Sequence, residues 1–263
     1  MNRGLNWLRG LAEGKALGGF PASVQVVDGE LDNRLARFIA VVPDADNPFP
    51  RARQGEVGLL EGWGLAKAVD EAIEADSAGE KRVIVAVIDV PSQAYGRREE
   101  ALGIHQALAG AVDAYARARL AGHPVIGLLV GKAMSGAFLA HGYQAQRLIA
   151  LDDSGVMVHA MGKAAAARIT LRSVEELEAL AASVPPMAYD LDSYASLGLL
   201  WRRVAVASAQ APSTDDLAQV RECLVQAVED IGDSTDLSGR LGSEQRQASS
   251  VVRQRLRAQW REA

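Results

Sequence analysis

Apolar residues follow two different spacings along the chain, and each spacing predicts a different kind of element. In residues 55–75 leucine, valine and isoleucine recur every three or four positions, which predicts an amphipathic helix. Residues 82–90 and 124–130 are continuous β-branched runs, typical of strands buried on both faces. Between them, residues 97–120 are rich in alanine and predict one long helix. This strand–helix–strand order predicts parallel pairing through right-handed crossovers.

The two ends of the chain carry further patterns. Weak alternation in residues 23–27 and 34–42, with Asp28 and Gly29 punctuating the first segment, predicts two adjacent strands or a hairpin. After Arg172 the spacing is mostly helical, and the last helix is predicted to span about 243–260. We therefore expect one α/β domain over residues 1–263, an N-terminal helix within 1–20 and a helical C-terminal extension over about 170–263.

Composition narrows the class of protein. The 28 Lys and Arg against 33 Asp and Glu give a formal net charge of −5, which argues against a general nucleic-acid binder. A single cysteine, Cys223, excludes a disulfide framework and suits a reducing cytosol. The apolar runs are too short to span a bilayer, and the N-terminus lacks a secretory pattern. The histidines lack the close helical spacing of a zinc site. We expect a cytoplasmic protein without a metal.

The strongest candidate for chemistry is the segment 130–138, where a buried strand ends, small residues turn the chain and a helix begins at about Ser135. The first amides of such a helix have no intrahelical acceptor and lie at the positive end of its dipole. Gly136 and Ala137 are small, so a ligand could approach their N–H groups closely. Such a pair could form an oxyanion hole for a thioester or enolate oxygen. Small residues also serve tight helix–strand packing, and the pattern leaves both interpretations open.

A second strand end, at residues 89–100, also leads into a predicted helix. Sites in parallel-sheet proteins lie beyond the carboxyl ends of the strands, so both loops should face one crevice. Ser92, Gln93 and Tyr95 are candidates for contact with a substrate there. Ser135 is the corresponding candidate from the first loop. Each of these side chains could equally be an ordinary loop residue.

Ser135 also permits a nucleophile hypothesis. It lies at a predicted helix start 24 residues before His159, somewhat like the serine of Clp-type peptidases. A serine nucleophile needs a base within hydrogen-bond reach and a group that orients the base. Asp152 and Asp153 precede His159 in a predicted turn, and neither is a convincing orienting acid. A helix N-cap or a packing role is the alternative for Ser135.

Five segments keep the order of motifs in a known family. They are residues 89–93, 100–104, 114–116, 124–126 and 132–138. In these segments the chain resembles the carboxyltransferase C-terminal domain of biotin-dependent acyl-CoA carboxylases, within the crotonase superfamily. The resemblance implies an α/β chain of the crotonase (ClpP/crotonase-like) fold, with stacked ββα units and here a helical C-terminal extension.

Three departures separate the chain from the biotin-dependent enzymes. Ser92 and Gln93 replace the Gly-Phe of the first loop, and Ser135 replaces the first glycine of the second. The chain also supplies only one of the two crotonase-type domains that such an enzyme needs. A free-standing domain with an altered biotin loop resembles the gamma subunit of the biotin-independent malonate decarboxylases.

This resemblance implies a heterodimer with a beta subunit. The pair would decarboxylate malonyl-[acyl carrier protein] to the acetyl thioester and carbon dioxide, through an oxyanion-stabilised enolate. The substrate arm would be the phosphopantetheine-type group of the carrier protein, with no biotin and no cofactor bound by this chain. Carried over residue by residue, the Gly136 and Ala137 amides form a second oxyanion hole. Two alternatives remain, a carboxyltransferase subunit of a biotin-dependent acyl-CoA carboxylase and a Clp-like serine hydrolase.

The end of the chain carries a separate signal. From Arg240 onward six arginines stand against two glutamates, a net charge of about +4. Val252, Leu256 and Trp260 repeat at i, i+4 and i+8 and form an apolar stripe. The helix could dock a partner subunit or an acidic carrier protein, or it could be a solvated surface helix.

Overall fold

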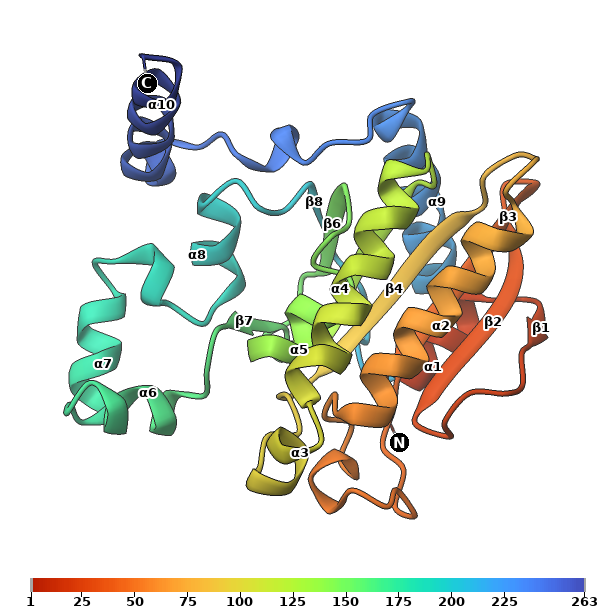
Figure 1. Cartoon of the computed structure of the whole chain (residues 1–263), viewed down its shortest axis with the longest axis horizontal. Helices are drawn as coiled ribbons and strands as arrows, with labels where there is room; N and C mark the ends of the chain where they lie inside the picture. The colour runs from red at the N-terminus through yellow and green to blue at the C-terminus, as the bar shows by residue number, and fades with distance from the viewer. Residues whose placement is uncertain (1, 263) are drawn as a thin grey trace.

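A mixed eight-stranded sheet forms the centre of the computed structural model, which describes residues 2–262 (Figure 1). The end residues of the expected domain, Met1 and Ala263, lie outside this part. The strand order is β1-β2-β3-β4-β5-β6-β8, and β7 pairs with β5 off this path. The strands are β1 (Lys15–Ala16), β2 (Val24–Leu31), β3 (Arg34–Val41), β4 (Val83–Val90), β5 (Val125–Met134), β6 (Arg147–Leu151), β7 (Met157–His159) and β8 (Arg202–Val204).

Pairing from β3 through β8 is parallel, as the strand–helix–strand order predicts. β4 and β5 are the predicted apolar runs, and nearly all their side chains are buried. β5 is longer than predicted and has two neighbours. Its first half pairs with β6, while its last three residues, starting at Lys132, pair with β7. This division carries the end of β5 out of the main sheet and towards the next helix.

β2 and β3 form the expected antiparallel hairpin, with a turn at Asp32 and Asn33. Both turn residues have positive φ, which Asp and Asn tolerate better than most residues. The expected punctuation at Asp28 was wrong, because this residue continues β2. Its carboxylate receives hydrogen bonds from Arg37 at 2.7 Å and Arg82 at 2.9 Å, so the sheet supplies partners for a residue that usually marks turns.

Helices cover both faces of the sheet (Figure 1). Helices α2 and α4 pack together on one face, and α1 and α9 lie on the other. The helices are α1 (Arg3–Leu11), α2 (Leu59–Ala75), α3 (Arg97–Ala101), α4 (Ile104–Leu120), α5 (Ser135–Ala140), α6 (Lys163–Ile169), α7 (Val174–Ala181), α8 (Leu191–Ser196), α9 (Thr214–Ile231) and α10 (Gln247–Glu262). Short 3-10 turns are η1 (Pro50–Ala52), η2 (Pro185–Met187), η3 (Ser238–Arg240) and η4 (Glu244–Arg246).

Two predicted helical segments are interrupted near a glycine with positive φ. The alanine-rich segment is not one helix but α3 and α4, separated at Gly103, whose φ of +83° is left-handed. The helix that begins at Ser135 ends at Ala140, and Gly142, at φ +89°, turns the chain towards β6. Periodicity continues across both glycines, so the breaks come from backbone conformation and not from a change in apolar spacing.

The C-terminal third does more than extend the helical layer. β8 lies within it and pairs with β6, although its sequence, Arg202–Val204, has no strand-like alternation. α6, α7, η2 and α8 form a lobe beside β7, with a small apolar cluster of their own centred on Leu177 and Tyr189. α10 stands at the margin of the molecule, beyond α8 (Figure 1).

Candidate functional site

The loops after β4 and β5 meet at the start of α5. Gly136 N donates a hydrogen bond to the Gln93 side-chain oxygen Oε1 at 2.6 Å. Gln93 N in turn donates to Ser135 Oγ at 3.4 Å, a weaker contact. The two strand ends are therefore in direct contact, although these residues are about 43 positions apart in sequence.

Asp89, at the end of β4, determines how β5 reaches α5. Its Oδ1 accepts a hydrogen bond from Lys132 N at 3.1 Å. A Cβ on Gly131 would lie 2.1 Å from the same oxygen, so only glycine permits this crossing. Immediately after the crossing, Ser135 adopts a φ of +52°, a left-handed conformation that costs free energy for a residue with a side chain. The carboxylate thus holds the strand end in the path that starts α5.

The other predicted site residues lie around this contact. Ser92 Oγ donates to the Gln93 carbonyl at 3.0 Å, within the same loop. Tyr95 is 54% exposed, and a hydrogen bond with Glu100 raises the pKa of its hydroxyl. Ala137 is fully buried in the first turn of α5. The structure thus brings Gln93, Ser135 and Gly136 together and leaves Ser92 and Tyr95 on the flank.

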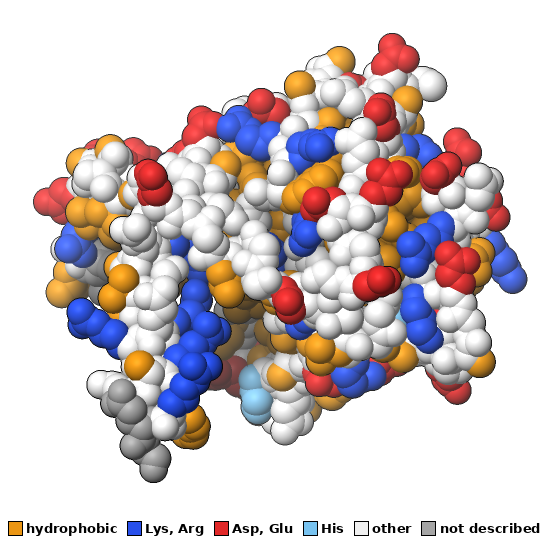
Figure 2. Space-filling model, turned by 90° about the horizontal axis from the view of Figure 1, so that it is seen from above, with side chains coloured by type: hydrophobic (Ala, Val, Ile, Leu, Met, Phe, Trp, Pro, Cys, Tyr) orange, Lys and Arg blue, Asp and Glu red, His pale blue; other side chains and the backbone are white. Residues whose placement is uncertain are grey.

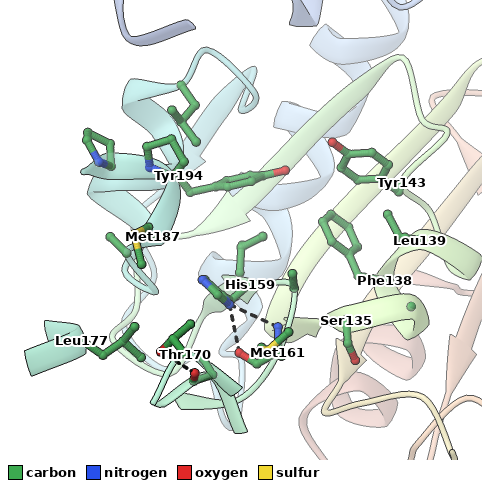
Figure 3. Close-up of a pocket in the computed structure, with 18 residues that line it drawn as sticks. Ser135, Phe138, Leu139, Tyr143, His159, Met161, Thr170, Leu177, Met187 and Tyr194 are labelled. Atoms are coloured by element: carbon green, nitrogen blue, oxygen red, sulfur yellow. Dashed lines mark hydrogen bonds between the residues drawn. The ribbon is translucent and has the colours of Figure 1, made fainter. Parts of the chain in front are cut away.

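A cavity of about 500 Å³ opens beside α5, between that helix and the lobe of α6 to α8 (Figure 3). It begins at Ser135 and Gly136 and continues over mostly apolar side chains. No sequence pattern predicts this wall, which includes Phe138, Leu139, Tyr143, Met161, Thr170, Leu177, Met187 and Tyr194. No spacing marks these residues as a group, because they come from separate elements that only the folded chain brings together.

His159 does not act on Ser135. Its Nδ1 is hydrogen-bonded to the backbone of Met161, and the ring is stacked on Tyr189 with centroids 3.8 Å apart. Burial lowers its pKa, although hydrogen bonds to the backbone of Met161 and Met187 raise it. Figure 3 shows the Ser135 hydroxyl directed away from the imidazole. The geometry lacks the serine–base pair that a Clp-like hydrolase requires.

Arg240 connects the cavity wall to the C-terminal segment. Its guanidinium donates to the carbonyl oxygens of Tyr143 at 2.7 Å and Ala145 at 2.8 Å, and lies 4.7 Å from the Tyr143 ring centroid. Burial lowers the pKa of Arg240. These contacts pin η3 against the turn after α5, so the chain that leads to α10 is anchored to the site's wall.

Residues 2–262 contain no group of three or more His, Cys, Asp or Glu side chains placed to hold a metal ion. None of their helices is long and apolar enough to cross a membrane.

Comparisons with known proteins identify the relatives of the chain. A family model described as malonate decarboxylase gamma subunit matches residues 52–260. The chain is similar to a Pseudomonas malonate decarboxylase hetero-tetramer solved with coenzyme A, at 73% identity over 99% of this chain and 100% of that one, with a TM-score of 0.96. It is also similar to a Pseudomonas malonate decarboxylase MdcD-MdcE hetero-dimer, at 71% identity over 99% and 100% of the two chains, with a TM-score of 0.92.

The chain is also similar to two more distant proteins. The malonyl-S-ACP:biotin-protein carboxyltransferase of Malonomonas rubra is 38% identical over 154 residues, which are 57% of this chain and 53% of that protein. The chain thus spans about half the length of this curated relative. The transcarboxylase 12S core superposes with a TM-score of 0.65 at 19% identity, over 88% of this chain and 41% of that one, and supports the fold alone. The expected crotonase-like carboxyltransferase fold is confirmed.

Proposed function

Because the chain belongs to the malonate decarboxylase gamma subunit family, we propose that it pairs with a beta subunit and decarboxylates a malonyl thioester. The products are the acetyl thioester and carbon dioxide. The observation that carries the proposal is the 73% identity, over the full length, to a chain of a malonate decarboxylase solved with coenzyme A. The substrate's thioester arm is the phosphopantetheine-type group of an acyl carrier protein, as the name of the Malonomonas relative suggests.

The reaction breaks the bond between the carboxylate carbon and the α-carbon. The bonding electron pair moves into an enolate whose charge rests on the thioester oxygen, and a proton then adds to the α-carbon. Fixed N–H donors lower the barrier because the negative charge on this oxygen develops in the transition state. In the two-subunit proposal the beta subunit supplies these donors. This chain contributes the start of α5, with Gly136 and Ala137 facing the other end of the malonyl group.

The substrate contacts that we propose follow the geometry of the two loops. Gln93 N lies within hydrogen-bond distance of Ser135 Oγ, and Ser135 lines the apolar cavity. Ser92 and Tyr95 lie on the same loop as Gln93 and are the other proposed contacts. The cavity is lined mostly by carbon atoms and suits the methylene and thioether part of a pantetheine arm.

Three further features belong to this proposal. Residues 1–263 act as one domain, because α1 and α9, from opposite ends of the chain, pack on the same face of the sheet. The chain works in the cytoplasm, where its one cysteine, buried Cys223, stays reduced. It binds no biotin, since its first loop departs from the loop of biotin-dependent enzymes at Ser92 and Gln93.

The proposal is tested by carbon dioxide release from malonyl thioester with avidin present. The chain alone and the chain co-purified with its beta subunit are compared. Release only from the pair is the expected result. Release that avidin abolishes would favour the biotin-dependent carboxyltransferase, and no release from either preparation would contradict the proposal.

Gly136→Val tests the start of α5. A Cβ at position 136 would lie 3.0 Å from Gln93 Oε1, so the larger side chain disturbs the contact between the two loops. We expect kcat/KM to fall by about tenfold or more while binding to the beta subunit is unchanged. The matched control is Gly79→Val, because a Cβ at Gly79 meets nothing within 4 Å. Equal activity of the two variants would exclude α5 from the site.

A further inference from the structure

Gln93 is held in place by its own loop. Val57 N donates to the Ser92 carbonyl at 3.1 Å, and Ala94 N donates to the Val57 carbonyl at 2.8 Å. These two hydrogen bonds flank Gln93 and tie the loop to the start of α2. The side chain is therefore presented to α5 from a fixed backbone and is not a freely rotating surface group.

The Gln93 side chain already accepts a hydrogen bond from the Gly136 N–H, which the resemblance assigns to an oxyanion hole. At 2.6 Å, the bond from Gly136 N to Oε1 is at the short end for an N–H···O contact. A Cβ on Gly136 would lie 3.0 Å from Oε1 and 3.3 Å from Cδ, closer than most real contacts. The glycine thus makes room for a side chain of the same chain. A ligand oxygen reaches this N–H only if Gln93 moves away.

The nitrogen of the Gln93 carboxamide remains available to a ligand. A carboxamide nitrogen carries two N–H donors in addition to the acceptor oxygen. Within residues 2–262, no hydrogen bond joins the Gln93 Nε2 to another residue. Gln93 is only half-buried, and its backbone contacts Ser135, which lines the cavity. Because Oε1 accepts from Gly136, the carboxamide is polarised and its N–H groups become better donors.

We infer that Gln93 determines specificity in the proposed decarboxylation. Its oxygen accepts the hydrogen bond of the Gly136 N–H and so prevents the carbonyl of a cyclic urea from binding there, and its own N–H donors bind the malonyl carboxylate. The inference rests on the proposed function. A cyclic urea carbonyl, as in biotin, is an acceptor and needs an open N–H. A carboxylate is also an acceptor, and it is satisfied by the donors that Gln93 presents instead. The phenylalanine of the resembled family can do neither.

The role predicts a particular kinetic signature. The carboxylate loses its charge as it becomes carbon dioxide, so hydrogen bonds to it are strongest before the bond breaks. Such contacts stabilise the bound substrate more than the transition state. Loss of Gln93 should therefore raise KM and leave kcat unchanged or higher.

The experiment uses the heterodimer with the beta subunit and malonyl-coenzyme A as the substrate. Gln93→Leu is compared with Gln106→Leu, a matched change at an exposed glutamine on α4. We expect Gln93→Leu to raise KM by about tenfold with a smaller change in kcat. The Gly136 amide proton should move upfield in its NMR spectrum, because its hydrogen bond is lost. The urea 2-imidazolidinone should inhibit this variant and leave the wild type unaffected.

A second variant separates the two ends of the carboxamide. Gln93→Glu keeps an acceptor for Gly136 and removes the N–H donors, so the Gly136 resonance should stay downfield. Its KM should rise further than that of Gln93→Leu, because a carboxylate repels the substrate carboxylate.

Two results would overturn the inference. The first is a KM of Gln93→Leu equal to that of Gln106→Leu, and the second is an unmoved Gly136 resonance. If the wild-type heterodimer releases no carbon dioxide, the proposed function fails. The Gly136 resonance and 2-imidazolidinone binding to Gln93→Leu then still decide whether Gln93 closes the N–H.

Discussion

Helices α9 and α10 both show apolar stripes with helical spacing, but within residues 2–262 only the stripe of α9 is buried. α9 buries its stripe, including Val220, Leu224 and Ile231, against the sheet and α1. In α10, Leu256 is 59% exposed and Trp260 is 87% exposed. An apolar stripe therefore predicts which face of a helix favours burial, but it does not predict which element covers that face.

Charge sharpens the difference between the two helices. α9 carries Asp215 and Asp216 in its first turn, and Ser213 with Asp216 forms a capping box there. The 3-10 turn η4, which leads into α10, has Ser243 at its N-cap position, but the Ser243 side chain makes no capping hydrogen bond. Four arginines lie on α10 itself, and Figure 2, in which this helix is at the left, shows basic side chains gathered along it. α9 is thus built into the body by local and tertiary contacts, whereas α10 is held mainly by its own hydrogen bonds.

The largest expected difference between the helices comes from the same substitution in each. Leu224→Ala removes a fully buried side chain from α9 and should lower the free energy of unfolding by about 3 to 4 kcal/mol. Leu256→Ala in α10 should change it by less than about 0.5 kcal/mol. Urea denaturation of both variants measures the comparison. Similar losses at the two positions would show that α10 packs on the body.

Acid should destabilise the body and leave α10 unaffected. Burial lowers the pKa of His141 to about 4, and its ring is satisfied while neutral by Tyr115 Oη and the Val87 carbonyl, both at 3.1 Å. An unfolded histidine takes up a proton below about pH 6.5, so stability is lost as the pH falls from about 6.5 to 4. The loss from this residue is up to about 3 kcal/mol.

Denaturation across this pH range tests the role of His141. His141→Gln should be less stable than the wild type at pH 7 and show a shallower loss in acid. His105→Gln, at an exposed histidine of α4, should keep the wild-type slope. The assignment is contradicted if His141→Gln retains the full pH dependence.

Arg240 lies between the two regions and should have an intermediate effect. Arg240→Met leaves the Tyr143 and Ala145 carbonyl oxygens without their donor, which should cost about 2 kcal/mol. Arg257→Met on α10 is the control and should cost nothing measurable. Thermal unfolding of both variants distinguishes an anchored segment from a loose one, and equal melting temperatures would refute the anchor.

Removal of α10 should have the smallest effect. A chain that ends at residue 246 keeps Arg240 and loses a helix whose apolar side chains are largely exposed. We expect the free energy of unfolding to stay within about 0.5 kcal/mol of the full-length value. A chain cut at 239 should be less stable, because it also loses the Arg240 contacts. If the two truncated chains are equally stable, Arg240 does not mark the boundary between the stable body and the C-terminal segment.

The parts of the fold that the sequence predicts are those with a dense local signal. β4 and β5 are buried β-branched runs, and their parallel pairing follows from the intervening helix. β8 has three residues, two of them exposed arginines, and becomes a strand only because β6 offers a free edge. The break at Gly103 was missed because apolar spacing continues across it, and a single left-handed residue is enough to end α3.

The candidate site divides in the same way. Strand ends followed by small residues mark Gln93, Ser135 and Gly136 as neighbours of one crevice. Which atoms meet there depends on the register between β4 and β5 and on the Asp89 contact at the bend of β5. The apolar cavity beside them has no sequence signature, because its walls come from α5, β7 and the lobe of α6 to α8.

The sequence by itself determined the main strands and helices, such as β4, β5 and α2, and predicted that the ends of β4 and β5 lie together, since burial periodicity and backbone preference are local properties. Through its motif order it also identified the family. Tertiary structure alone decided that Gln93 accepts the hydrogen bond of the Gly136 N–H and that His159 is held away from Ser135. It also decided that the apolar stripe of α9 is buried while that of α10 is exposed. These outcomes depend on distances between residues far apart in the chain, which side-chain packing sets and local pattern does not encode.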